Sequence, residues 1–297
     1  MMDTETWKGP EQVQELLAAQ SYIADLSLAT AIFLSARLGK PLLVEGEPGC
    51  GKTEIAKVLS AATGGELIRL QCFEGLDSRS ALYDWDYPRQ LLMIRMHERD
   101  TATETLEKQV FSERFLQRGP LLRALGGDAA HRPVLLIDEV DRADEEFEGL
   151  LLEVLSDFQI TVPEIGTLRA TRPPLVVITS NRTRTLSDAL KRRCLYAYVD
   201  YPDAEKELTI LRRRVPSLDA AFARQVVGFV QRLRREPDLA KRPGVAETLD
   251  WAAALLTLRI DALDPAAVAT TLGFLIKDAD DLELLRSRHA ALLESPE

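Results

Sequence analysis

The sequence predicts an α/β domain, in which helices cover both faces of a parallel sheet, followed by a smaller domain built only of helices. Three short apolar runs, at residues 42–44, 134–137 and 175–179, suit buried strands, and residues 67–72 are expected to form a further strand. Helical patterns alternate with these runs, and such alternation favours a parallel sheet. After Tyr201 and Pro202 no further strand pattern occurs, so we expect the first domain at residues 1–201 and the helical domain at residues 202–297.

Apolar residues at intervals of three and four predict the helices of both domains. In the first domain this pattern runs from residue 11 to residue 38, and again from residue 52 to residue 62. In the second domain prolines mark the limits of five expected helices, at residues 204–215, 219–236, 246–259, 265–277 and 280–293. The helical domain is therefore expected to have a core of its own.

The composition limits the class of protein. The 297 residues include 37 basic and 47 acidic ones, and a net charge of -10 argues against a dedicated nucleic-acid-binding protein. The polar N-terminus is unlike a secretory signal, and no apolar run approaches the roughly 18 residues of a membrane span. Cys50, Cys72 and Cys194 are far apart, and they form no metal-ligand pattern with the three histidines. We expect a cytoplasmic protein with reduced cysteines.

A phosphate-binding motif lies between the first strand and the helix that follows it. The motif G-x-x-x-x-G-K-[ST] is formed by Gly46, Glu47, Pro48, Gly49, Cys50, Gly51, Lys52 and Thr53. Glycines let backbone N–H groups surround phosphates, and the helix N-terminus adds the positive end of its dipole. The sequence therefore predicts an ATP site in which Lys52 reaches the β- and γ-phosphates and Thr53 is a ligand of Mg²⁺. Cys50 is interpreted as a small residue of the loop, and a redox switch is the less favoured alternative.

Two acidic residues end the strand at residues 134–137. Burial of a strand does not require consecutive carboxylates at its end, and ligands bind at the carboxyl ends of parallel strands. Asp138 suits a ligand that holds Mg²⁺ through water, and Glu139 suits a base that polarises an attacking water. A solvated turn after the strand is the alternative, and the phosphate-binding motif makes it the weaker one.

Two further features follow along the chain. Asn181 lies just beyond the strand expected at residues 175–179, where an amide can contact the γ-phosphate and orient the water; a turn-forming role is the alternative. A basic cluster that includes Arg192 and Arg193 comes next. Such clusters are usually solvated helix faces, but this position suits an arginine supplied across a subunit boundary.

In their order and spacing these four features resemble the AAA+ ATPases. Residues 148–163, with Ile165, Gly166 and Thr167, resemble a segment of the MoxR family that ends in a hairpin, expected here at residues 160–170. Residues 70–77 and 81–87 resemble the CoxD-like branch; they belong to an irregular segment, residues 73–127, where a charged helical stretch is expected at 90–118. The resemblance covers most of residues 10–260 and implies a P-loop AAA+ domain with a helical lid, ATP and Mg²⁺ as cofactors, and a hexameric ring.

The resemblance also implies roles for individual residues. Arg193 matches the arginine finger, with Arg192 as the alternative, and Asn181 matches the first sensor. Members of the MoxR family carry a second-sensor arginine at the start of a lid helix. This sequence has Glu247 there, so either Arg242 serves from a displaced position or the lid responds to nucleotide without such an arginine.

Three functions are compatible with these motifs. The first is an ATP-driven chaperone, as the MoxR resemblance implies, with a von Willebrand factor A domain partner and a client such as a molybdenum-containing hydroxylase, for example carbon monoxide dehydrogenase. The second is a clamp-loader-like or helicase-like motor that depends on nucleic acid, suggested by the arginines at residues 212–214 and 232–235. The third, a P-loop kinase or GTPase, ranks last because the guanine-recognising N-K-x-D motif does not occur.

Overall fold

The computed structural model describes residue 4 and residues 7–97, 103–126 and 131–294. The chain forms two compact units. The first consists of Met1–Leu16, Ala24–Glu45 and Thr53–Tyr198, and the second of Leu17–Ile23, Gly46–Lys52 and Val199–Glu297. By its contacts, the turn at residues 46–52 thus belongs with the C-terminal helices, although the strand before it and the helix after it belong to the first unit.

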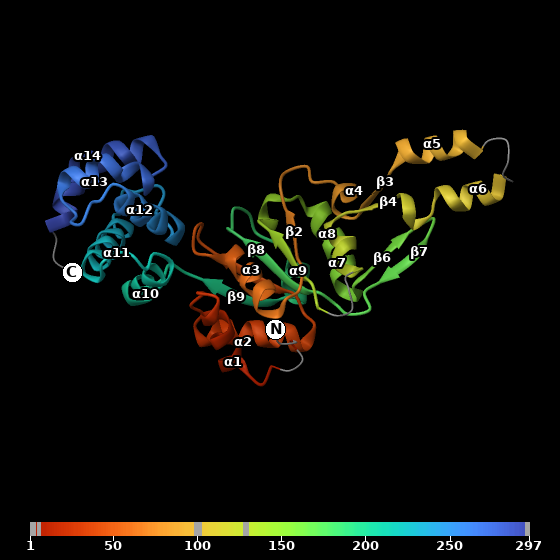
Figure 1. The fold of residues 1–297 in the computed structure, drawn as a ribbon, viewed down its shortest axis with the longest axis horizontal. Coiled ribbons are helices and arrows are strands. Elements are labelled where there is room, and N and C mark those ends of the chain that lie inside the picture. Colours follow the sequence, from red (N-terminus) through yellow and green to blue (C-terminus); the bar gives the residue numbers. More distant parts are fainter. Residues whose placement is uncertain (1–3, 5–6, 98–102, 127–130, 295–297) are drawn as a thin grey trace. The chain divides into compact units, whose positions relative to one another are not determined.

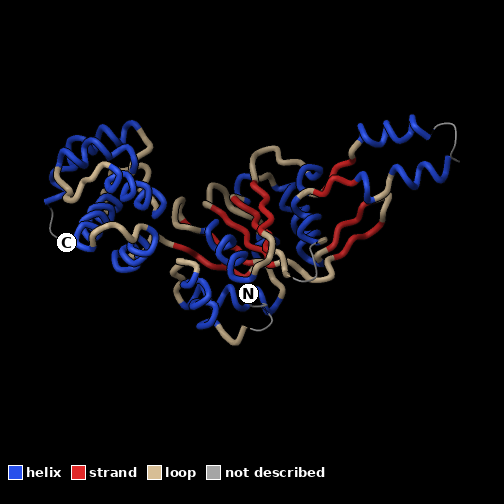
Figure 2. The backbone as a smooth tube through the Cα atoms, in the orientation of Figure 1, coloured by secondary structure: helices blue, strands red, loops and turns tan. Residues whose placement is uncertain are grey.

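A five-stranded sheet is the centre of the first unit (Figures 1 and 2). Its strand order is β2 (Leu67–Gln71), β5 (Val134–Asp138), β8 (Leu175–Ser180), β1 (Leu42–Gly46) and β9 (Leu195–Val199). The pairings of β2 with β5, β5 with β8 and β8 with β1 are parallel. Every residue of β1, β5 and β8 is buried, as expected where both faces of a sheet are covered. The predicted α/β fold is confirmed, and β9 is a strand that the sequence pattern did not reveal.

Helices and short 3₁₀ turns connect these strands. Before residue 199 the structure has α1 (Pro10–Ala19), α2 (Leu26–Leu38), α3 (Lys52–Thr63), α4 (Ser78–Ala81), α5 (Tyr87–His97), α6 (Thr103–Val110), η2 (Glu113–Phe115), α7 (Pro120–Leu125), η3 (Val140–Arg142), α8 (Glu145–Asp157) and α9 (Asp188–Arg193). The single helix expected at residues 11–38 is wrong. Ser21 adopts a left-handed backbone with φ of 62°, and Asp25 caps a new helix by accepting from the Leu28 N–H.

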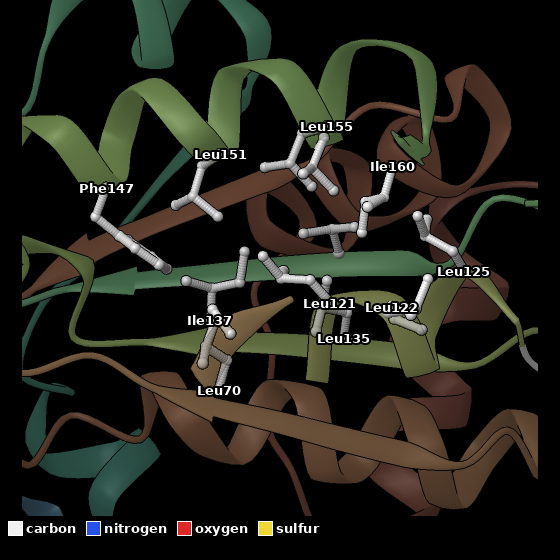
Figure 3. Packing of buried hydrophobic residues seen from close by; sticks show 14 of the residues in the cluster. Leu70, Leu121, Leu122, Leu125, Leu135, Ile137, Phe147, Leu151, Leu155 and Ile160 are labelled. Carbon is white, nitrogen blue, oxygen red and sulfur yellow. The ribbon is translucent and has the colours of Figure 1, made fainter. Parts of the chain in front are cut away.

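One face of the sheet packs against α8 through a continuous apolar cluster. Figure 3 shows Phe147, Leu151 and Leu155 of α8 directed toward the sheet, where Ile137 of β5 lies. Spacings of four residues bring these three side chains to one side of the helix, which explains the amphipathic pattern. The shared apolar cluster thus holds α8 against the face of the sheet to which Leu135 and Ile137 of β5 contribute.

Two insertions extend this apolar cluster. The first contains β3 (Tyr83–Trp85) and β4 (Leu116–Arg118), an antiparallel pair that encloses α5, α6 and η2. The helix expected at residues 90–118 is therefore right only in part, and residues 98–102 within it lie outside the described residues. The second insertion is the antiparallel hairpin of β6 (Gln159–Val162) and β7 (Gly166–Arg169), which confirms the hairpin expected at residues 160–170.

The second unit is dominated by helices, here called the lid. They are α10 (Ala204–Arg214), α11 (Ala220–Arg234), α12 (Val245–Thr257), α13 (Pro265–Thr271), η4 (Leu272–Phe274) and α14 (Ala279–Glu294). All five expected helices are present, although α13 ends early in the 3₁₀ turn η4. Phe229 and Trp251 are fully buried with ring centroids 5.4 Å apart, so the lid has a core of its own. Within the described part of the chain, no helix combines the length and apolar character that a membrane span requires.

Candidate functional site

The turn at residues 46–52 has the backbone of a phosphate-binding loop. Gly49 and Gly51 lie in the left-handed region, with φ of 76° and 86°, which residues with a Cβ rarely adopt. The Lys52 ammonium is buried and donates to the carbonyl oxygens of Gly46 at 2.8 Å and Glu47 at 2.6 Å. The lysine thus lies against the loop from which it projects, in the place where the motif requires a cation.

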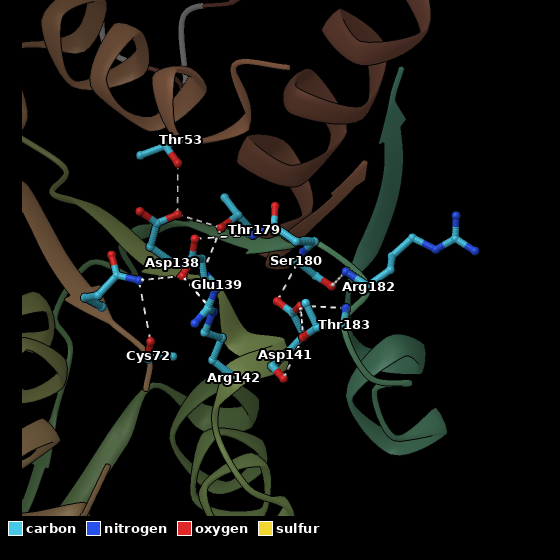
Figure 4. Close-up of polar contacts among 12 residues, drawn as sticks. Thr53, Cys72, Asp138, Glu139, Asp141, Arg142, Thr179, Ser180, Arg182 and Thr183 are labelled. Atoms are coloured by element: carbon cyan, nitrogen blue, oxygen red, sulfur yellow. Dashed lines mark hydrogen bonds and ion pairs between the residues drawn. The ribbon is translucent and has the colours of Figure 1, made fainter. Parts of the chain in front are cut away.

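Asp138, at the end of β5, is hydrogen-bonded to residues of three other elements, and Figure 4 shows two of them, Thr53 and Thr179. Its Oδ1 accepts from the hydroxyls of Thr53 at 2.9 Å and Thr179 at 2.6 Å. Its Oδ2 accepts from Arg69 Nη2 at 2.6 Å and from Nε at 3.1 Å. Asp138 is only 2% exposed, so these four contacts replace the water that a carboxylate needs. They come from β2, α3 and β8, and Thr53 directly follows Lys52 in the chain.

Glu139 is held beside Asp138 by an unusual backbone. Its φ of 55° is left-handed, a conformation that costs a non-glycine residue about 1–2 kcal/mol and concentrates at functional sites. The Glu139 N–H donates to Thr179 Oγ1 at 2.9 Å, which explains how the turn is kept. The carboxylate accepts from Asn181 Nδ2 at 3.2 Å and Gln71 Nε2 at 3.3 Å, and pairs with Arg142 Nε at 3.2 Å.

Asp141 fixes the turn that carries Asn181. This buried carboxylate accepts from the Asn181 N–H at 3.1 Å, and from the Thr183 N–H and hydroxyl at 2.9 and 2.6 Å (Figure 4). Burial raises the pKa of Asp141, but these hydrogen bonds outweigh that effect, so the pKa lies below its ordinary value. Asp141 therefore stays ionised and holds the Asn181 amide in reach of Glu139.

The structure brings four of the expected site residues, Thr53, Asp138, Glu139 and Asn181, into one hydrogen-bonded cluster. Sequence reasoning missed a further set of residues that completes the cluster: Arg69, Gln71, Asp141, Arg142 and Thr179. The chemical roles of all these residues stay predictions.

Arg193 lies outside this cluster. It is exposed at the end of α9, where its Nε donates to Ser156 Oγ at 2.9 Å and its Nη1 to the Ala189 carbonyl at 3.3 Å. Arg192 is also exposed. Helix α9 itself is anchored, because the N–H of its cap residue, Ser187, donates to the buried Glu148 of α8 at 3.0 Å. Both arginines are therefore presented to the surroundings from a fixed helix.

The start of α12 holds the residue found at the expected second-sensor position. Glu247 accepts from the Gly244 N–H at 2.9 Å and so caps its own helix. Arg242 is exposed, and its carbonyl accepts from the Tyr201 hydroxyl at 3.4 Å. Glu247 therefore has a structural task at this end of the helix, and neither residue is assigned a sensor role by these contacts.

The cysteines are free and weakly acidic. Burial raises the pKa of Cys50 to about 11, despite the opposing charges of Lys52 and Arg234. Burial likewise raises the pKa of Cys72 and of Cys194 to about 12. The thiolate is the reactive form of cysteine, so these values favour the interpretation of Cys50 as a small loop residue over a redox switch.

The donor set beside the phosphate-binding loop fits Mg²⁺. The Thr53 hydroxyl and the Asp138 carboxylate are oxygen ligands, which Mg²⁺ prefers, and they lie 2.9 Å apart. Among the described residues no three His, Cys, Asp or Glu side chains gather into a metal site. Mg²⁺ usually takes one or two protein oxygens and completes its coordination with substrate phosphates and water, so Thr53 and Asp138 suit this ion.

The chain is similar in sequence to a known domain family and to several bacterial proteins. Residues 41–194 match the model of the AAA domain family, dynein-related subfamily. An uncharacterized protein of Staphylococcus haemolyticus (strain JCSC1435) is 27% identical over 237 residues, covering 77% of this chain and 80% of its own length. One of Staphylococcus epidermidis is 27% identical over 247 residues, covering 81% and 82%.

Solved structures similar to this chain include two of RuvB from Thermotoga maritima. The P216G mutant aligns with a TM-score of 0.49 and 18% identity, covering 100% of this chain and 82% of the RuvB chain. The Holliday junction branch migration motor aligns with a TM-score of 0.47 and 18% identity, covering 99% and 83%.

Proposed function

We infer the function from the family: this chain belongs to the AAA domain family, dynein-related subfamily, whose members are nucleotide-hydrolysing ATPases. We propose that it binds ATP with Mg²⁺ at residues 46–53 and hydrolyses it in the cytoplasm, as part of a hexameric ring. We further propose that the energy is used to remodel or activate another protein complex, and that the chain is of the MoxR type.

The observation that carries the proposed hydrolysis is the cluster at the carboxyl ends of β5 and β8. Thr53 and Asp138 would hold Mg²⁺, the latter through water; the ion would neutralise charge that develops on the phosphates. Glu139 is proposed as the base for the attacking water, and Asn181 is proposed to orient Glu139 and the water. The 3.2 Å hydrogen bond from Asn181 Nδ2 to Glu139 supports this assignment.

The ion pair between Arg69 and Asp138 leads to a prediction about Mg²⁺. Arg69→Met is expected to lower the half-saturating Mg²⁺ concentration for ATP binding about two- to fivefold, because a cation no longer competes for Asp138. The small size follows from the half-exposed guanidinium, since such pairs are worth about 0.2–1 kcal/mol. The measurement is a fluorescence titration of labelled ATP at varied Mg²⁺.

Arg142→Met is the matched control for Arg69→Met, because Arg142 pairs with Glu139 rather than with Asp138. It should leave the Mg²⁺ requirement unchanged. If Arg69→Met instead raised the requirement, Arg69 would be a residue that orients Asp138 for the metal.

The proposed action on a protein client is supported by the two insertions. Trp85 of the first insertion is buried, with ring centroids 5.4 Å from Phe111 and 6.5 Å from Tyr83, so it packs in the domain's own core. The exposed Glu164, at the tip of the β6–β7 hairpin, lies near enough for its charge to add to burial in raising the pKa of Tyr83. Tyr83 of the first insertion and Ile165 of the hairpin pack against the same apolar cluster, and Glu164 is an exposed charged residue at the hairpin tip.

The hairpin tip gives the test of the remodelling function. Changing Glu164 to Gly and Ile165 to Ser is expected to leave basal ATP hydrolysis within about twofold, because neither residue belongs to the hydrogen-bonded cluster around Asp138 and Glu139, while client activation is abolished. The readout is the activity of the proposed client, a molybdenum-containing hydroxylase such as carbon monoxide dehydrogenase, produced in cells together with each variant.

Ile165 is half-buried against the apolar cluster, so two controls accompany the double change. Glu164→Gly alone keeps that packing, and Arg169→Ala alters an exposed residue of the hairpin away from its tip. Full client activation by the double variant would exclude the tip as the gripping element.

The client and partner are proposed from the MoxR and CoxD-like resemblance at residues 148–167 and 70–87. By this proposal a von Willebrand factor A domain protein connects the ring to the hydroxylase. Co-purification of such a protein with the Glu139→Gln variant, and its absence with Lys52→Ala, is the supporting outcome.

A motor that depends on nucleic acid is the second candidate function. The contacts of the lid arginines argue against it. Arg234 is 6% exposed and pairs with Glu207 at 2.6 Å, so the arginines at residues 232–235 do not form one basic surface. Nucleic acid that stimulated ATP hydrolysis, with a steep loss of the effect in salt, would favour this candidate over the chaperone.

A further inference from the structure

The lid touches the phosphate-binding loop through main-chain atoms. Both segments belong to the second unit. The Val245 N–H, at the start of α12, donates to the Gly49 carbonyl at 3.0 Å. Gly244 approaches so closely that a Cβ on it would lie 2.6 Å from Gly49 Cα and 2.9 Å from Glu247 Oε2. Only a residue without a side chain fits at position 244 while this contact exists.

This contact controls the direction of an N–H group in the loop. A trans peptide is planar, so the carbonyl of Gly49 and the N–H of Cys50 point in opposite directions. The hydrogen bond that turns the Gly49 carbonyl toward Val245 therefore turns the Cys50 N–H away from the lid. Backbone N–H groups are the groups with which such a loop binds phosphate, so their direction decides its affinity.

The lid segment that makes the contact is held rigidly. Arg234 Nε donates to the Pro243 carbonyl at 2.7 Å, and the guanidinium pairs with Glu207 at 2.6 Å. Glu207 is 1% exposed and also accepts from the Thr248 hydroxyl at 2.8 Å. Residues 243–245 are thus tied to α10, α11 and α12 together.

We propose that residues 243–245 are a positioning element for the nucleotide. Through the Val245 N–H and the close approach of Gly244, they hold the phosphate-binding loop in the conformation that binds ATP. The coupling between lid and nucleotide then runs through the main chain and needs no arginine at position 247. This inference rests on the proposed binding of ATP at residues 46–53.

The test removes a single N–H group. Val245 is the first residue of α12, where proline is well tolerated, and Gly244 has the extended backbone that a residue before proline requires. Val245→Pro therefore deletes the donor and keeps the helix. Val245→Ala keeps the donor and loses a similar part of the buried side chain. The dissociation constants of ATP and ADP are expected to be about fivefold higher for the proline variant than for the alanine variant.

A second pair of variants tests the close approach. Gly244→Ala is expected to weaken ATP binding about tenfold, because the new Cβ displaces the loop. Gly273→Ala in the same unit is the control and should bind ATP normally, since a Cβ there meets nothing within 4 Å. Melting temperatures without nucleotide show whether the variants are folded.

Hydrogen exchange distinguishes positioning from stability alone. Coupling is reciprocal, so ATP should slow amide exchange in the first turn of α12 in the unaltered protein, and less so in Val245→Pro. Equal ATP affinity of the proline and alanine variants, with unchanged protection of α12, would overturn the inference while ATP binding persists. Absence of ATP binding by the unaltered protein would overturn the proposed function instead.

Discussion

Arg193→Ala is expected to bind ATP with nearly normal affinity and to hydrolyse it about 10³–10⁵-fold more slowly, the range found for arginine fingers. The reason is that Arg193 is exposed at the end of α9 and contacts Ser156 and Ala189, so it is available to the site of a neighbouring subunit. Single-turnover hydrolysis and equilibrium binding of ATP measure the two effects separately.

Mixing gives the sharper form of this experiment. Under conditions where subunits exchange, Arg193→Ala mixed with Lys52→Ala should regain activity, since a mixed ring contains composite sites with an intact lysine and an intact arginine. The same experiment with Arg192→Ala shows whether Arg192 or Arg193 is the arginine finger. Failure to regain activity, together with full activity of the unaltered protein as a dilute monomer, would remove the case for a shared site.

Glu139→Gln is expected to retain ATP binding and to hydrolyse ATP at least about 10²-fold more slowly, the lower range for loss of a positioned base. Glutamine keeps the size of the side chain, so the contacts with Asn181 and Gln71 can largely persist while the basic carboxylate is lost. The control is Lys52→Ala, which should lose ATP binding because the phosphates lose their main cation. Undiminished turnover by Glu139→Gln would exclude this residue as the base.

The sequence predicts those parts of the fold and site that depend on local patterns. The strand, glycine-rich turn and helix around residues 42–63 are contiguous, so the motif and its structural setting are read from one stretch of chain. The hairpin at residues 159–169 and the five lid helices are likewise defined by nearby turn residues and prolines. Asp138 and Asn181 each follow an apolar run, and this position identified them as candidate residues of the nucleotide site.

The residues that were missed depend on strand order and backbone conformation. Arg69 and Gln71 alternate with the buried Ile68 and Leu70, but only the pairing of β2 with β5 brings them to Asp138 and Glu139. No single-sequence pattern gives that register. The break between α1 and α2 depends on a left-handed serine, which has no sequence signature as clear as glycine or proline.

The position of Arg69 has a consequence for solubility. Strand β2 is the last strand at one end of the sheet order, and an edge strand offers free main-chain groups to which another chain can add by β-pairing. Long charged side chains on such a strand hinder this aggregation, and Arg69 is a half-exposed cation in its middle. The guanidinium that pairs with Asp138 thus also places a charge on a terminal strand of the sheet, where charge disfavours pairing with another chain.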